Sequence, residues 1–157
     1  PVSRGGLLLG KLLPYAIMAF GALMIVLTLM TTLFEVRING SLVLLIFLSC
    51  LFILTALGLG LLISTIARAQ VQAMQFAFMI MLPSVLLSGF MFPRSEMPMI
   101  IYLFSHLLPV TYFIEILRGI IIRGAELRAL LPHVAGLVTC LVVVLTLSIT
   151  RFRKQLD

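Results

Sequence analysis

The chain of 157 residues has no tryptophan, only two cysteines and very few charges. Charged residues make up 10% of it and hydrophobic residues 62%, whereas soluble domains are about 25% charged and about 45–50% apolar. This shortage of charge excludes an ordinary soluble domain. Cys50 and Cys140 lie inside apolar runs, without a second Cys or a His at metal-ligand spacing. We therefore expect neither a disulfide framework nor a metal site, and no cofactor bound by this chain.

Four long stretches contain no Asp, Glu, Lys or Arg. A helix needs about 20 apolar residues to cross a hydrocarbon core about 30 Å thick. The sequence thus predicts an all-α membrane protein in which residues 1–157 form a single transmembrane domain. Its four spanning helices are expected over residues 12–34, 42–66, 70–92 and 131–150.

The segment "PVSRGGLLLGK", residues 1–11, precedes the first span and mixes apolar with basic residues. Leucines on one side and Arg4 and Lys11 at the headgroups are typical of an interfacial helix. The segment also contains the start of a phosphate-binding loop, GxxxxGK. Leu12 stands where that loop needs Ser or Thr, and a membrane span follows, so we do not expect nucleotide binding here.

Small residues recur at four-residue spacing in the second and third spans. Such rows let helices approach closely where lipid gives no hydrophobic driving force, so we expect packing seams there. A substrate path along the same rows is the alternative. The residues are Ala56, Gly60 and Ser64 in the second span, and Ala69, Ala73 and Ala77 in the third.

Residues 98–122 are long enough to cross the membrane, but Pro109 interrupts them. The residue before a proline is disfavoured in a helix, so we expect two half-length helices forming an external re-entrant hairpin. Glu115 and Arg118 stand three residues apart and share a helix face. They are predicted to form a structural ion pair, since paired charges near the membrane surface cost less than a lone charge at its centre.

A re-entrant hairpin leaves four crossings, which places both chain ends on one side. The basic cluster of Arg151, Arg153 and Lys154 marks that side as cytoplasmic by the positive-inside rule. The net charge of +6 is spread over loops and gives no basic face for nucleic acid, which we do not expect as a partner.

Four segments in register resemble the type-2 ABC transporter permeases, and the resemblance covers essentially the whole chain. They are "PVSRGGLLLGKLLPY", "LGLGLLISTIARAQVQAMQ", "LPSVLLSGFMFPRSEMP" and "LLPVTYFIEILRGIIIRG". The resemblance implies a fragment that lacks the family's first two spans and any external domain. It implies a partner ABC ATPase subunit that holds ATP and Mg, and a second permease half, identical or different.

The same resemblance assigns residues 1–11 to the coupling helix that docks on the ATPase. The coupling residues would be Val2, Ser3, Arg4, Leu7, Leu8 and Lys11. The pair Gly5–Gly6 departs from the family, whose members often carry an acidic residue near that position. The re-entrant pair, residues 98–122, would cap the translocation path.

The expected function is the membrane subunit of an ATP-driven exporter in a bacterial inner membrane, with surrounding lipid as a further partner. It would not itself be an enzyme, and would move a hydrophobic or amphipathic compound, drug-like or lipid-like, out of the cell. An ion-coupled secondary transporter is the first alternative, but it needs an ionisable group within a span. A non-transporting membrane assembly protein is the second.

Overall fold

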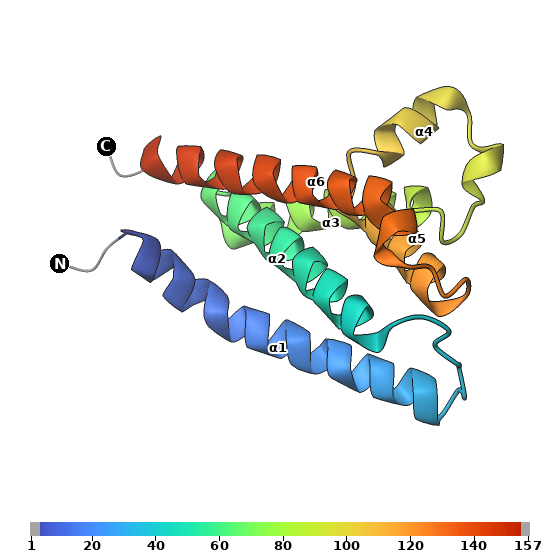
Figure 1. The fold of residues 1–157 in the computed structure, drawn as a ribbon. Helices are drawn as coiled ribbons and strands as arrows, with labels where there is room; N and C mark the ends of the chain where they lie inside the picture. The colour runs from blue at the N-terminus through green and yellow to red at the C-terminus, as the bar shows by residue number, and fades with distance from the viewer. Residues whose placement is uncertain (1–3, 155–157) are drawn as a thin grey trace.

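The computed structural model describes residues 4–154, and the side chains of residues 6 and 9–151 within them. All regular secondary structure in the described part is helical, and there is no strand in it. Figure 1 shows the elements in chain order, which are α1 (Arg4–Thr32), α2 (Leu42–Ile66), α3 (Gln70–Leu87), the 3-10 helix η1 (Arg94–Glu96), α4 (Met99–Ser105), α5 (Pro109–Ile121) and α6 (Leu127–Lys154).

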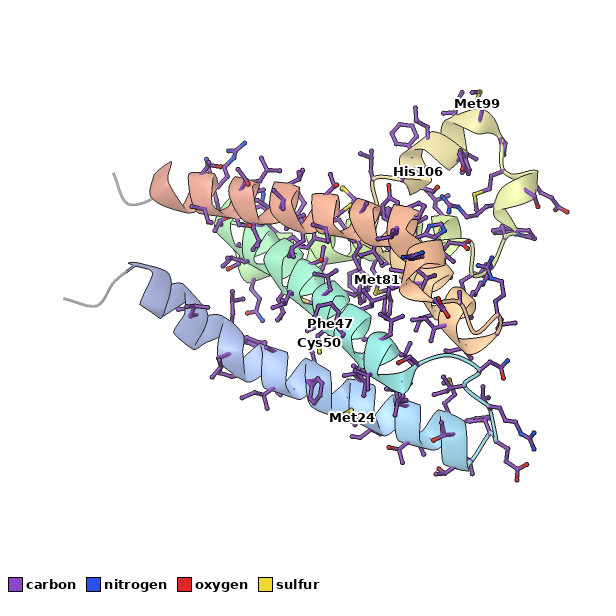
Figure 2. All side chains as sticks on the ribbon, in the orientation of Figure 1. Met24, Phe47, Cys50, Met81, Met99 and His106 are labelled. Carbon is purple, nitrogen blue, oxygen red and sulfur yellow. The ribbon has the colours of Figure 1, made fainter. Side chains whose placement is uncertain are left out.

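Four of these helices, α1, α2, α3 and α6, are long and apolar enough to cross a membrane. They run alternately up and down, so the start of α1, the end of α2 and the end of α6 share one end of the molecule (Figure 1). Large apolar side chains stay exposed along them, among them Met24, Phe47 and Met81 (Figure 2). Soluble monomers rarely expose such a continuous apolar surface. The prediction of an all-α membrane protein with four spanning helices is confirmed.

The first eleven residues differ from expectation, because the described part of them is not a separate interfacial helix. Residues from Arg4 onward form the first turns of α1, which continues unbroken to Thr32. α1 continues through Lys11 without a break, and Pro14 lies within this helix. Pro14 lacks the N–H that would bond the carbonyl of Gly10. The boundary expected between residues 11 and 12 is therefore absent, and Pro14 only weakens one turn of a continuous helix.

Two of the other three spans, α3 and α6, also differ in length from the predicted ranges. α2 has the bounds expected for it, Leu42–Ile66. α3 ends at Leu87, five residues before the predicted end, and Gly89 follows with a φ of 85°. Glycine takes this left-handed conformation without steric cost, which allows the chain to turn away from the helix axis. α6 is longer than predicted at both ends.

The core of the molecule is built around α5, which lies against both α2 and α6. Ile116 and Ile120 of α5 are fully buried. They belong to one cluster with Leu27, Leu45, Leu48, Leu130 and Leu137 of the three neighbouring long helices. Phe52 of α2 stacks on Phe113 of α5, with ring centroids 4.2 Å apart. α5 is therefore a core element, with its apolar face packed on protein.

α2 and α6 pack closely against each other at Gly58. A Cβ added there would lie 3.0 Å from Cγ1 of Val144. The hydroxyl of Ser148 donates to the carbonyl of Gly58 at 3.1 Å and to that of Val144 at 2.8 Å. Small residues at such contacts let backbones come together and let a hydroxyl bridge the two helices. The packing seam of α2 runs through Gly58.

α4 and α5 meet at an angle of 87° across the break at Pro109. The predicted break is present, but the two pieces form a right angle, where an in-and-back hairpin was expected. Both lie at the end of the molecule that carries the α1–α2 connection and the start of α6 (Figure 1). Whether they re-enter a bilayer stays a prediction.

The connection between α1 and α2 is fastened to the end of α5. Asn39 donates through its backbone N–H to the carbonyl of Ile121 at 3.3 Å and through Nδ2 to that of Ile122 at 2.9 Å. A Cβ added at the neighbouring Gly40 would come within 2.7 Å of the carbonyl oxygen of Ile120. Carbonyls at a helix end have no partner in the helix, so Asn39 supplies one and holds the far end of α1.

We predict that Gly58→Leu destabilises the fold and that Gly60→Leu, two residues away on the same helix, does not. Leucine at position 58 would overlap Val144, and overpacking costs about 1–3 kcal/mol. A Cβ at Gly60 meets nothing within 4 Å. Thermal unfolding in detergent measures the difference. Equal melting temperatures for the two variants would contradict the seam.

Candidate functional site

Arg94 of η1 is the centre of a polar cluster at the α4–α5 end of the molecule. Its Nη2 donates to Oγ of Ser105 at 3.5 Å and lies 3.4 Å from Nε2 of His106. Its guanidinium also lies over the ring of Tyr102, with 5.1 Å between Cζ and the ring centroid. The Arg94 side chain is only 15% exposed. One arginine therefore ties the turn after α3 to α4.

The contacts of His106 fix its neutral tautomer. Nδ1 lies 2.9 Å from the carbonyl oxygen of Tyr102, and because a carbonyl only accepts, Nδ1 carries the hydrogen. Nε2 is then the acceptor that faces the guanidinium of Arg94. The ring of His106, labelled in Figure 2, also lies edge-on to Tyr102 of α4 and to Tyr112 of α5, with ring centroids 4.6 Å and 6.0 Å apart, so it sits between the two helices at their bend.

Glu115 of α5 is shared between two arginines, neither of which is Arg118. Its Oε1 lies 4.0 Å from Nη1 of Arg94 and its Oε2 lies 3.9 Å from Nη2 of Arg123. These distances exceed hydrogen-bond length, so the contacts are ion pairs without a hydrogen bond. The Glu115 side chain is 19% exposed and that of Arg123 is 63% exposed. Partial burial of Glu115 and Arg94 strengthens their attraction relative to a surface pair.

Arg118 instead reaches back to the end of α3. Its Nη2 donates to the carbonyl of Gly89 at 2.7 Å. Within the described residues no ion pair joins it to Glu115, so the predicted Glu115–Arg118 pair is wrong. Spacing along one helix places two side chains on a shared face, but it does not show which of them finds a better partner on another element. For Arg118 that partner is an acceptor just beyond the last turn of α3.

Sequence reasoning missed Arg94 as a site residue. Its local signal was weak, because it lies in the turn "FMFPRSEMP", where a charge is ordinary. The useful signal was the shortage of acids, since Glu115 is the only carboxylate in a long apolar stretch and has several arginines to choose from. The cluster offers no nucleophile with a base, and no group of metal-ligating side chains was found among the described residues. Its evident role is to hold η1, α4, α5 and the end of α3 together.

The predicted coupling residues that the structure describes, Arg4, Leu7, Leu8 and Lys11, lie at the opposite end of the molecule. Val2 and Ser3 are outside the described residues. Arg4, Leu7 and Leu8 belong to the first turns of α1, but their side chains are outside the described part. The GxxxxGK sequence is helical from Gly5 to Lys11, which differs from the glycine-rich loop that cradles phosphates.

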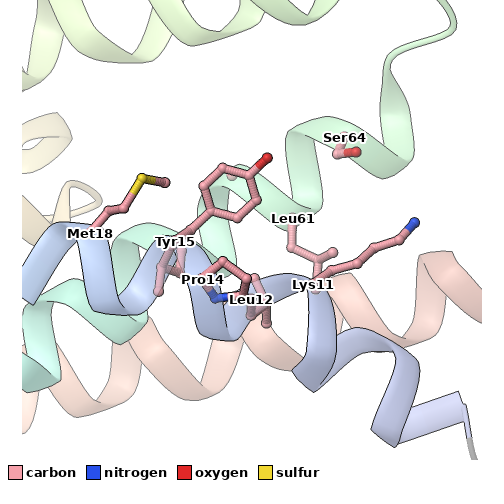
Figure 3. A pocket seen from close by; sticks show the side chains of 9 residues that line it. Lys11, Leu12, Pro14, Tyr15, Met18, Leu61 and Ser64 are labelled. Atoms are coloured by element: carbon pink, nitrogen blue, oxygen red, sulfur yellow. The ribbon is translucent and has the colours of Figure 1, made fainter.

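A groove with a volume of about 740 Å³ separates α1 from α2 near that end. Its walls come from one face of each helix, and Figure 3 shows Lys11 and Tyr15 extending from α1 toward α2. The lining residues are Lys11, Leu12, Pro14, Tyr15, Met18, Leu57, Gly60, Leu61 and Ser64. α1 and α2 thus pack together near Leu27 and part toward the start of α1 (Figure 1).

The predicted small-residue rows do not form packing seams within this chain. Ala56, Gly60 and Ser64 are exposed, and the last two line the groove. In α3, Ala73 is half-buried, whereas Ala69 and Ala77 are exposed. Four-residue spacing alone does not show which face of an all-apolar helix meets a neighbour. The buried positions of α2 lie on another face, which includes Thr55, Gly58 and Thr65.

The long helices expose apolar side chains along their length, and the charged groups lie near the helix ends. The described part contains no catalytic site. These features define an integral membrane protein with several spans. The profile of the ABC-2 type transporter family matches residues 1–122. The chain belongs to this family.

Three curated relatives carry permease names. The "Probable multidrug ABC transporter permease YbhS" of Escherichia coli K12 is 36% identical over 157 residues, covering 99% of this chain and 42% of the relative. "Probable multidrug ABC transporter permease YbhR" is 32% identical over 127 residues, 81% of this chain and 34% of the relative.

The third relative, "Inner membrane transport permease YhhJ", is 29% identical over 121 residues, which is 77% of this chain and 32% of the relative. The chain thus spans less than half the length of these three relatives. No solved structure matches the chain.

We predict that Arg94 and Glu115 are energetically coupled and that Glu115 and Arg118 are not. Arg94→Gln loses several charge-assisted contacts at once and should cost about 2–3 kcal/mol, since hydrogen bonds to charged groups contribute about 1.5–3 kcal/mol. Double-mutant cycles on detergent unfolding compare the pairs. The effects of Glu115→Gln and Arg118→Gln should add within about 0.5 kcal/mol, whereas those of Arg94→Gln and Glu115→Gln should not. A larger coupling energy between Glu115 and Arg118 than between Glu115 and Arg94 would support the Glu115–Arg118 pair that the sequence predicted.

Proposed function

We propose that this chain is the membrane-spanning permease part of an ATP-driven ABC exporter that moves a hydrophobic or amphipathic compound out of the cell. The observation that carries the proposal is the match of the ABC-2 type transporter profile to 122 residues, joined to a permease relative that aligns over 99% of the chain. Two relatives are named as probable multidrug transporter permeases, which supports a hydrophobic or amphipathic substrate.

The proposal places ATP hydrolysis on a separate ABC ATPase subunit, with ATP and Mg held there. A second permease half, identical or different, would complete the membrane unit. The segment that most resembles a nucleotide-binding loop, Gly5 to Lys11, is helical in α1. This favours ATP binding on the partner subunit. Six basic residues and no described acidic residue lie at the end that carries the start of α1 and the end of α6, and the positive-inside rule then favours a cytoplasmic location for that end.

α1 provides a direct route from the proposed ATPase contact to the far side of the membrane. Its 29 residues rise by about 1.5 Å each, which makes a rod about 43 Å long. The rod packs into the core through Leu27 in its far half, and the connection that follows it bonds the end of α5 through Asn39. A displacement of the first turns of α1 would therefore reach α5 and the Arg94 cluster through covalent and hydrogen-bonded contacts.

We predict that transport in proteoliposomes requires the ATPase subunit and ATP, and that a proton or sodium gradient alone does not drive it. A fluorescent hydrophobic cation serves as the transported probe, and its efflux is measured with ATP, with a non-hydrolysable analogue and with an imposed gradient. Transport driven by a gradient without ATP would overturn the proposal in favour of a secondary transporter.

The Asn39→Ala variant tests the route in the same assay. It should lower the transport rate several-fold per ATP hydrolysed, because the Nδ2 bond to the carbonyl of Ile122 is lost and only the backbone bond to Ile121 still holds this connection on α5. Thr32→Ala is the matched control, since the Thr32 hydroxyl bonds only the carbonyl of Thr28 within α1, at 2.7 Å. Equal losses in both variants would exclude Asn39 from the route.

We further predict that both ends of the described chain face the cytoplasm and that η1 faces outward. Single cysteines at Ala69, Glu96 and Arg151, in a background without Cys50 and Cys140, are labelled with a membrane-impermeant maleimide. Only Glu96→Cys should react in intact cells, and Ala69→Cys and Arg151→Cys should react after permeabilisation. If Arg151→Cys reacts in intact cells, the segment at residues 98–122 crosses the membrane and the re-entrant interpretation fails.

A further inference from the structure

The groove between α1 and α2 is apolar along its length and cationic at one end. Leu12, Met18, Leu57 and Leu61 supply apolar walls, and Gly60 leaves the floor open because a Cβ there would meet nothing within 4 Å. The stretch of α1 from Lys11 to Met18 rises by about 10 Å. The volume of about 740 Å³ is within the range of about 300–1,000 Å³ that is typical of ligand pockets.

Polar groups mark the mouth of this groove. Figure 3 shows the Lys11 ammonium and the Tyr15 hydroxyl pointing into the space between the helices, with Ser64 opposite. A second hollow of about 350 Å³ shares Gly60 and Ser64 with the groove and is lined by Arg68. The two hollows therefore adjoin at Gly60 and Ser64, and each of them is lined by one cation, Lys11 in the groove and Arg68 in the second hollow.

Lys11 and Arg68 form no ion pair with a described residue. No carboxylate of the described residues lies within 4.0 Å of the Lys11 or Arg68 side-chain nitrogens. The four glutamates of the described part, Glu35, Glu96, Glu115 and Glu126, lie in the connections and helices at the other end of the molecule (Figure 1). Among the described residues, the two cations that line these hollows therefore have no acidic partner.

We propose that an anionic phospholipid from the surrounding leaflet occupies this groove. One acyl chain lies along the apolar walls between α1 and α2, and the phosphate lies at the mouth between Lys11 and Arg68. Basic pockets between membrane helices bind anionic headgroups, and each cation near the surface contributes about 1 kcal/mol, which corresponds to about a fivefold change in affinity. A zwitterionic lipid or an uncharged apolar helix would fill the groove without compensating these two charges.

The site is additional to the proposed transport function and does not depend on it. Lipid binding needs neither the ATPase subunit nor ATP, so it is measured on the permease chain alone. A failed transport assay and a failed lipid assay are thus separate results. Bound lipid would keep α1 apart from α2 on the side where the first turns of α1 are proposed to receive the ATPase signal.

The absence of tryptophan from the 157 residues makes a direct test practical. Met18→Trp places a fluorophore in the groove, and Ile17→Trp places one at the same depth outside the groove lining. Any tryptophan outside these residues is replaced by phenylalanine. The full chain is reconstituted in phosphatidylcholine bilayers, and quenching is titrated with brominated phosphatidylglycerol or brominated phosphatidylcholine at equal mole fractions.

We expect the apparent affinity of the Met18→Trp site for phosphatidylglycerol to exceed that for phosphatidylcholine by about 5- to 30-fold, as two cations would give. Ile17→Trp should show a ratio near one, because it faces bulk lipid. Adding Lys11→Gln or Arg68→Gln should each lower the ratio about fivefold. Gly60→Leu should reduce quenching at Met18→Trp by filling the groove, whereas Gly21→Leu, also in open space, should not.

Two results would overturn the proposal. Equal quenching by both lipids in the Met18→Trp variant would mean that only bulk lipid enters the groove. Quenching well below that of Ile17→Trp would mean that protein fills it, either a second copy or another segment of a longer chain. Both tryptophan positions are exposed on α1, so a folding defect is not expected to obscure the comparison.

Discussion

Dispersion contacts between α5 and its two neighbours, α2 and α6, hold the centre of the molecule. In lipid there is no hydrophobic force between helices, so association depends on close packing and on polar bridges. Ile116 and Ile120 are fully enclosed by leucines of three long helices. A Cβ at Gly136 of α6 would run into the ring of Tyr112, which shows how closely the two helices approach. The right-angle bend at Pro109, the position of the Arg94 cluster and the fastening of α1 all depend on α5 staying in place.

The distribution of charge divides the molecule into two unlike ends. At the α4–α5 end, acidic residues and arginines occur together, and some of them pair, as Glu115 does with Arg94 and Arg123, or bond a backbone carbonyl, as Arg118 does with Gly89. At the other end the described residues carry basic side chains only. The first arrangement links η1 to α4 and α5 and so stabilises a bent segment of chain. The second leaves a field that attracts anions, whether from lipid, from an amphipathic substrate or from an acidic surface of a partner.

The periodicity and composition of the sequence were sufficient for the membrane class and for the four long helices. Uncharged runs of helix length have no other stable arrangement in a bilayer, and Pro109 marked the break between α4 and α5. The side-chain partners were a different problem. Glu115 had Arg118 three residues away, yet its attraction goes to Arg94 and Arg123, because tertiary packing brings the turn after α3 beside α5.

The sequence also did not show which face of each helix packs against a neighbour. α2 is apolar all round, so a row such as Ala56, Gly60 and Ser64 looked no different from the row that contains Thr55 and Gly58. Only the placement of α6, with Ser148 against Gly58, selects one face. The continuity of α1 was missed for a related reason. Glycines and a proline weaken a helix without necessarily ending it, and Gly10 and Pro14 lie within one turn of each other in a helix that the long apolar run sustains.

The fastening of Asn39 to the end of α5 has a consequence for how this protein tolerates changes in length. Connections on a protein surface usually accept insertions. Here the connection of nine residues between α1 and α2 must place Asn39 opposite the carbonyls of Ile121 and Ile122. The backbone at Gly40 lies close to Ile120, and the backbone at Gly124 lies close to Asn39, so the chain has no room to shift. A single inserted residue would misalign Asn39 and force a larger side chain toward position 40. Length variation among related chains should therefore be rare in this connection and concentrate in the turn around η1, whose residues Ser95 and Glu96 are exposed.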